Sequence, residues 1–90
     1  MPTLIVAYDL NNEVRRPKIV EAIKTTTWAR LSESSYAIDT SETPAQVLAR
    51  LRKFLDNDDN LYVINLVRPW SGWGPKDVIA WLVQRLGAGQ

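Results

Sequence analysis

The stretch LIVAYDLN at residues 4–11 decides the fold of this chain. Its apolar residues lead up to a single carboxylate, Asp9, and the β-branched Ile5 and Val6 favour a buried strand over a helix. Asp9 is therefore expected where a strand leaves the core. Polar and basic residues follow it, namely Asn11, Asn12, Arg15, Arg16 and Lys18. Because acidic, amide and cationic groups converge after this core element, we expect any chemistry to occur there.

The composition restricts the chemistry that the protein can perform. Its 90 residues are expected to form one domain, residues 1–90, with enough core to fold without disulfides. The chain contains no cysteine and no histidine, which excludes thiolate catalysis, serine–histidine catalysis and cysteine or histidine metal sites. A catalytic group must then be a carboxylate, a lysine, a tyrosine or a metal held by oxygen ligands.

The net charge is close to neutral, with eleven basic and ten acidic residues and a formal charge of +1. This balance is not the large basic excess typical of a protein that binds nucleic acid through bulk charge, so a local cluster would have to do so. The absence of cysteine, of a secretory signal and of an apolar run of membrane length predicts a cytoplasmic location without membrane contact.

The remaining pattern alternates strands and helices along the whole chain. We expect a helix from Pro17, with a face of Ile19, Val20 and Ile23, and a hairpin of strands at residues 28–31 and 34–40. Thr43, Pro44 and Gln46 form a capping-box signature for a second helix with apolar residues at helical spacing. These apolar residues are Val47, Leu48, Leu51, Phe54 and Leu55.

The chain is expected to end in a strand and a third helix. Residues 61–67 are largely apolar and predict the strand, and Pro75 and Gly87 bound the helical extension at about residues 75–86. The order predicts an α+β, ferredoxin-like sandwich, with a four-stranded antiparallel sheet, two helices on one face and the C-terminal helix in addition. The wide apolar surface of that last helix could cap the sheet or contact a second subunit.

Two further features have ordinary structural interpretations. The acidic residues at 56–60 alternate as in a calcium-binding loop, but Leu61 and Val67 stand where such a loop needs glycine and glutamate, which favours a solvated turn. The large aromatic residues are expected to be structural. Tyr36 and Trp28 are expected in the core. Two further tryptophans, Trp70 and Trp73, are expected to pack against the last helix, with stacking on the bases of a single-stranded nucleic acid as the alternative.

In this order of elements, the chain resembles the small CRISPR-associated endonuclease family, the smaller of the two spacer-acquisition proteins, and its relatives around virulence-associated protein D. The resemblance covers about residues 4–66. Its motifs are Tyr8-Asp9-Leu10, Arg15-Arg16 with Lys18, residues 32–36 where the family tends to carry glutamine, serine and phenylalanine, and the acidic residues 56–59.

The resemblance implies a homodimer in which the Asp9 carboxylates of both copies lie near the two-fold axis and hold Mg²⁺ or Mn²⁺. One carboxylate cannot form a site for a hard cation, whereas an isologous dimer doubles every ligand. Asp9 is then the catalytic and metal-binding residue. The residues expected to bind the RNA or DNA backbone are Arg15, Arg16, Lys18 and Arg30.

The chain departs from the family at three places. Ser32 replaces the glutamine, Ala37 stands where an acidic residue is common, and residues 70–86 replace a short final strand. A CRISPR-associated partner protein and a stand-alone role therefore both stay open.

Two functions are compatible with the sequence. The first is a metal-dependent endonuclease that uses paired Asp9, and the alternative is a non-catalytic dimeric module that binds a protein partner or a nucleic acid backbone. In the second case Asp9 caps the loop that follows it, and the basic run is a solvated surface.

Overall fold

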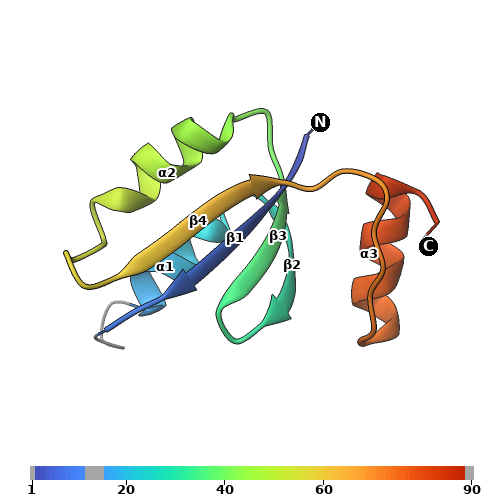
Figure 1. Ribbon diagram of the computed structural model, residues 1–90, viewed down its shortest axis with the longest axis horizontal. Helices are drawn as coiled ribbons and strands as arrows, with labels where there is room; N and C mark the ends of the chain where they lie inside the picture. Colours follow the sequence, from blue (N-terminus) through green and yellow to red (C-terminus); the bar gives the residue numbers. More distant parts are fainter. Residues whose placement is uncertain (1, 12–15, 89–90) are drawn as a thin grey trace.

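The computed structural model describes residues 2–11 and 16–88, and it contains one antiparallel sheet with three helices (Figure 1). The elements in chain order are β1 (Thr3–Asp9), α1 (Arg16–Ile23), β2 (Thr27–Ser32), β3 (Ser35–Asp39), α2 (Pro44–Arg52), β4 (Asn60–Asn65) and α3 (Lys76–Leu86). The order of elements that the sequence predicts is confirmed.

The four strands lie in the order β2-β3-β1-β4, and every neighbouring pair is antiparallel. The central strand β1 pairs with β3 on one side and with β4 on the other, so that residues 4–9 occupy the middle of the sheet as their apolar character requires. The strand order and the two crossover helices give the predicted ferredoxin-like α+β fold.

One face of the sheet forms the main core with α1 and α2. Alternate residues of β1, beginning with Leu4, point to this face, and the helices bury residues against them. The buried core residues are Leu4, Val6, Tyr8, Leu10, Ile19, Ile23, Tyr36, Ile38, Val47 and Leu51. Burial of Tyr36 in the core is thereby confirmed.

The helix ends show how local chemistry fixes α2. The Thr43 hydroxyl accepts a hydrogen bond from the Gln46 amide, and the Gln46 side chain accepts one from the Thr43 amide at 2.9 Å, which confirms the predicted capping box. The helix ends at Arg52, earlier than the predicted apolar stripe, and Phe54 and Leu55 pack against the core from the turn that follows. Likewise α1 begins at Arg16, so Pro17 is its second residue and not its first.

The opposite face of the sheet is covered over one half only, by α3. A second cluster joins Ala37 of β3 with Leu82 and Leu86 of α3, and α3 contacts β2 (Figure 1). The Arg85 guanidinium donates to the Asp39 carboxylate at 3.1 Å, and the Trp70 indole donates to the Gly87 carbonyl at 3.0 Å. The predicted alternative in which the last helix caps the sheet is therefore confirmed for the β2–β3 half.

Two tryptophans differ from the sequence expectation. Trp28 is 39% exposed because β2 is an edge strand, although its ring still meets Tyr36 edge-on with 5.8 Å between centroids. Trp73 is fully exposed, so of the expected pair only Trp70 packs against α3. No helix among the described residues is both long and apolar enough to cross a membrane.

Candidate functional site

Asp9 lies at the exposed end of β1, on the sheet face that α1 and α2 do not cover. It pairs in register with Asn60, the first residue of β4. A shallow hollow of about 310 Å³ opens here, and it is lined by Ala7, Tyr8, Asp9, Asn60 and Tyr62. The structure thus places Asp9 where the sequence predicts it, at the point where the central strand leaves the core.

Tyr8, the neighbour of Asp9, points to the other face and is buried. Its hydroxyl donates to the Glu33 carbonyl at 3.1 Å, and the Arg16 guanidinium lies 5.5 Å from the centre of its ring. Burial raises the pKa of the Tyr8 hydroxyl above its usual value, with Arg16 opposing that shift. Tyr8 therefore stays protonated at neutral pH and anchors the end of β1 to the β2–β3 turn.

The acidic turn before β4 supports the chain around Asp9. The Asp59 carboxylate accepts from the Asn11 amide at 2.7 Å and from the Asp56 amide at 2.8 Å. Asp59 thereby ties the residues that follow β1 to the residues that precede β4, since both lie at the same end of the sheet. Its role in this structure is that of a hydrogen-bond acceptor for the loops beside the site.

The predicted cations fall into two places. Arg16 donates to the Glu33 carbonyl, and the Arg30 Nε donates to the Ser32 carbonyl at 3.2 Å, so both guanidinium groups lie beside the β2–β3 turn. Lys18 lies elsewhere, in a hollow between α1 and Phe54 of the turn that follows α2. Arg15 lies outside the described residues. The structure therefore brings Arg16 and Arg30 together near Tyr8, but it does not bring Lys18 to them.

The donor set around Asp9 fits a hard cation only in part. Asp9 offers a carboxylate and Asn60 an amide oxygen, and among residues 2–11 and 16–88 no group of three or more acidic side chains lies together in a way that could hold a metal. Mg²⁺ needs octahedral oxygen coordination and keeps several waters, so two protein ligands from one chain make an incomplete site. A second copy of the same surface would double them.

Sequence reasoning missed Asn60 and Tyr62 as neighbours of Asp9. Both belong to β4, which is about 50 residues away in sequence, and only the β1–β4 register brings them beside β1. The sequence did carry one signal, the polar Asn60 just before the predicted strand at residues 61–67. A strand that pairs antiparallel with β1 begins beside the residue at which β1 ends, which is Asp9.

Comparison with known proteins supports the fold and no function. No protein-family model matches the chain, and no curated protein matches it. Among solved structures, the chain is similar to the crystal structure of a hypothetical protein TT1823 from Thermus thermophilus, with a TM-score of 0.69 and 22% sequence identity. The match covers 82% of this chain and 92% of the other. At this identity the similarity shows the shared fold alone.

Proposed function

We propose that this protein is a homodimeric, metal-dependent phosphodiesterase that cleaves RNA or DNA, with Asp9 of each copy as a metal ligand. The observation that carries the proposal is the position of Asp9, exposed at the rim of the half of the sheet that α3 leaves uncovered. An isologous dimer formed through this half would bring two Asp9 carboxylates and two Asn60 amides to one axis.

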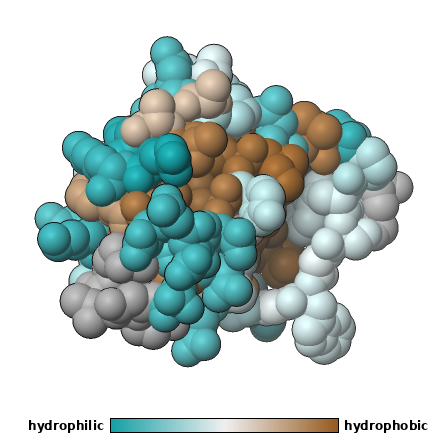
Figure 2. Space-filling view, turned by 60° about the vertical axis from the view of Figure 1, so that its left-hand side comes forward, coloured by the Kyte–Doolittle hydropathy of each residue, from teal (hydrophilic) through white to brown (hydrophobic). Residues whose placement is uncertain are grey.

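The surface beside Asp9 has the character of a contact between copies. Ile5 pairs with Ile64 and Ala7 with Tyr62 on this half of the sheet, and Tyr62 and Ile64 are 62% and 57% exposed. Figure 2 shows hydrophobic surface open to solvent across the middle of the molecule, bordered by hydrophilic side chains. Exposed apolar surface with a polar rim is typical of protein interaction sites, and a second copy is the partner that also completes the metal ligands.

The residues around the hollow would have separate roles in cleavage. A bound Mg²⁺ or Mn²⁺ would supply Lewis-acid activation of water and of the phosphate. Asp9 and Asn60 would hold that ion, and Arg16 and Arg30 would bind and position the nucleic acid backbone. Tyr8 remains a protonated structural residue with its hydroxyl bound to a carbonyl, so proton transfer from water is left to carboxylate or solvent.

A cleavage assay with matched variants tests this proposal. Purified parent, Asp9→Asn and Asp58→Asn are incubated with single-stranded RNA and with duplex DNA, in Mg²⁺, in Mn²⁺ and in chelator. Asp58 is an exposed carboxylate of the nearby turn and serves as the control. We expect metal-dependent cleavage by the parent and by Asp58→Asn, and none by Asp9→Asn. Equal cleavage by all three proteins, or by none, would exclude the nuclease.

The non-catalytic module is the second candidate, because Asp9 is the single carboxylate among the described residues that line the hollow. In that case the dimer would bind a nucleic acid backbone or a protein, either a CRISPR-associated partner or one in a stand-alone role. Asp9→Asn would then leave binding unchanged, and no metal would be needed.

A further inference from the structure

A second concave site lies at the opposite edge of the sheet from the hollow of Asp9, between the edge strand β2 and α3. We call it the β2–α3 cleft, and its lining residues are Trp28, Ala29, Arg30, Asp77, Val78 and Trp81. Its volume of about 360 Å³ is at the small end of the range for ligand sites. We infer that this cleft binds an unpaired nucleobase that carries an exocyclic amino group, as part of a single-stranded nucleic acid.

The two indole rings of the cleft provide the stacking surface. Trp28 comes from β2 and Trp81 from α3, and both retain exposed surface. Trp28 meets Tyr36 on the face that α1 and α2 cover, and Trp81 packs on the opposite face, so the two rings border the cleft from either side of the β2 edge. A cation lies over one face of each ring: the Lys24 ammonium is 4.4 Å from the centre of the Trp28 ring, and the Arg85 guanidinium is 3.9 Å from the centre of the Trp81 ring. A base would therefore stack on the faces and edges that these cations leave open. Arg85 is itself fixed by Asp39, so the Trp81 ring is oriented before any ligand arrives. Aromatic side chains of this kind are what proteins use to stack single-stranded bases.

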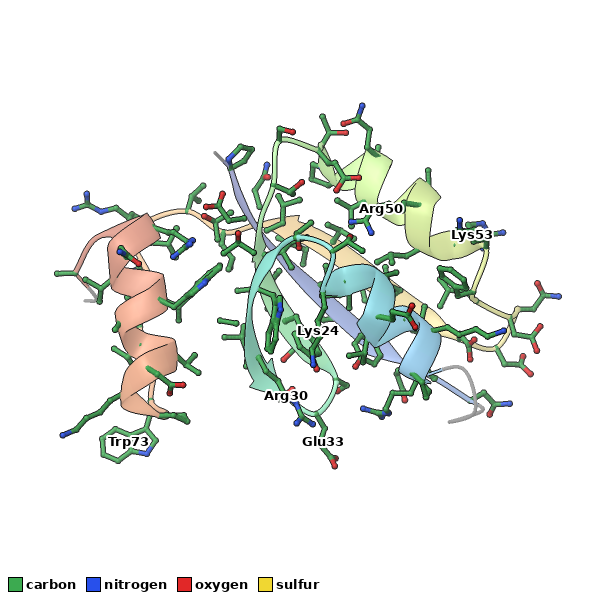
Figure 3. All side chains as sticks on the ribbon, turned by 180° about the vertical axis from the view of Figure 1, so that it is seen from behind. Lys24, Arg30, Glu33, Arg50, Lys53 and Trp73 are labelled. Carbon is green, nitrogen blue, oxygen red and sulfur yellow. The ribbon has the colours of Figure 1, made fainter. Side chains whose placement is uncertain are left out.

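The charge at the rim complements a phosphate. Apart from the bond from its Nε, the Arg30 guanidinium makes no hydrogen bond or ion pair with the described residues, and the Lys24 ammonium makes none. Lys24 lies over the ring of Trp28, and Arg30 follows Trp28 by two residues along β2, so both cations lie along this edge strand. Figure 3 shows both in the region of β2, whereas Trp73 lies at one end of α3. Two cations without an acidic partner among residues 2–11 and 16–88 favour an anionic chain over a neutral or basic peptide.

Asp77 gives the cleft a preference among bases. This exposed carboxylate in the first turn of α3 makes no hydrogen bond or ion pair with the described residues, so its oxygens are available to a ligand. A carboxylate accepts from the amino group of cytosine, whereas it repels the carbonyl oxygen that thymine and uracil carry at the same position. We therefore expect cytosine to be preferred over thymine, although the two stack on similar areas.

The inference deepens the proposed function, because it names single-stranded nucleic acid as the substrate. Only the cleavage of that strand rests on the proposed function; its binding to the cleft does not. Fluorescence anisotropy with labelled oligo(dC), oligo(dT) and duplex DNA measures binding to the parent. The variants are Trp28→Leu, Arg30→Gln and Asp77→Asn, with Trp73→Leu as the matched tryptophan control because Trp73 is fully exposed outside this cleft. Circular dichroism confirms that each variant is folded.

We expect oligo(dC) to bind the parent more tightly than oligo(dT) or duplex. Trp28→Leu should weaken oligo(dC) binding about 10-fold, Arg30→Gln should weaken both oligonucleotides alike, and Asp77→Asn should remove the preference for cytosine. Equal binding of duplex, an effect of Trp73→Leu as large as that of Trp28→Leu, or an unchanged preference in Asp77→Asn would overturn the inference. So would displacement of the oligonucleotide by cytidine monophosphate at equal nucleotide concentration, which would assign the cleft to a free nucleotide.

The two proposals fail separately. Asp9→Asn should abolish cleavage and leave oligo(dC) binding unchanged, since Asp9 is not part of the cleft. Binding that depends on Trp28 in a protein that never cleaves would retain the cleft and remove the nuclease. Cleavage that is unchanged in Trp28→Leu and Asp77→Asn would retain the nuclease and remove the cleft, since neither residue lines the hollow of Asp9.

Discussion

Arg50 binds both carboxylate oxygens of Glu42, from its Nε and Nη2 atoms, with a distance of 3.0 Å in each case. Its third nitrogen, Nη1, donates to the Ala22 carbonyl at 2.7 Å. One guanidinium therefore joins α2 to the end of α1 and to the loop before α2. The three nitrogens of the planar guanidinium donate to acceptors on two different elements at once. The single ammonium group of a lysine could not reproduce these bonds.

The first prediction concerns Arg50. Arg50→Met should lower the free energy of unfolding by about 1–2 kcal/mol, because charge-assisted bonds of a half-buried pair are lost and the Ala22 carbonyl loses a donor. Arg52→Met is the control, since Arg52 is exposed on the same helix. Urea denaturation measures both variants. An Arg52 variant as unstable as the Arg50 variant would show that α2 depends on its overall charge and not on this contact.

The second prediction concerns pH. The Arg50 hydrogen bonds hold the pKa of the Glu42 carboxyl below its usual value of 4.5, against an opposing contribution from burial. A carboxyl with a lowered pKa in the folded state stabilises the protein above its unfolded pKa, and this stability is lost as pH falls through the folded pKa. Glu42→Gln should therefore be less stable than the parent near pH 7, and the difference should shrink below about pH 4.

Urea midpoints of the parent and Glu42→Gln across that pH range test the linkage. Glu21→Gln is the control, because Glu21 is an exposed carboxylate of α1. Its difference from the parent should stay small at every pH. A Glu42→Gln difference that does not change with pH would mean that the carboxylate has no special role in the folded state.

The parts of the fold that follow from local signals were predictable from the sequence. The apolar run before Asp9 predicts the central strand, and Thr43, Pro44 and Gln46 predict the start of α2 to the residue. Such signals act within a few positions of the chain. They therefore require no knowledge of which strands become neighbours.

The contacts that depend on tertiary register were not predictable. Asn60 lies beside Asp9 only through the β1–β4 pairing, and Trp28 is exposed only because β2 becomes an edge strand. Arg50 illustrates the same limit, because only the folded chain brings its guanidinium to both Glu42 and the Ala22 carbonyl. Helical periodicity also continued past Arg52, where the chain had already turned.

The third prediction concerns the end of α3. Gly87 has φ +85° and ψ 179°, a conformation that is essentially restricted to glycine, and an added Cβ would lie 3.4 Å from the Arg68 guanidinium. Gly87→Ala should cost about 1–3 kcal/mol of stability. Gly74→Ala is the matched control, because no atom lies within 4 Å of its added Cβ. Thermal unfolding separates the two, and equal melting temperatures would contradict the role given to Gly87.

The last prediction concerns the dimer on which the nuclease proposal depends. A carboxylate introduced at Tyr62 or Ile64 would place like charges against each other across a two-fold axis, since an isologous contact pairs each residue with the same surface of the partner. Tyr62→Glu and Ile64→Glu should therefore behave as monomers of 10.2 kDa in light scattering, whereas the parent should have about twice that mass. Leu48→Glu, an exposed apolar position on α2, controls for the general effect of an added charge and should stay dimeric. The monomeric variants should remain folded, because both side chains already face solvent within one chain, and they should lose metal-dependent cleavage together with the dimer. Cleavage by a monomer would show that one Asp9 is sufficient, and a parent that is monomeric at every concentration would remove the paired site altogether.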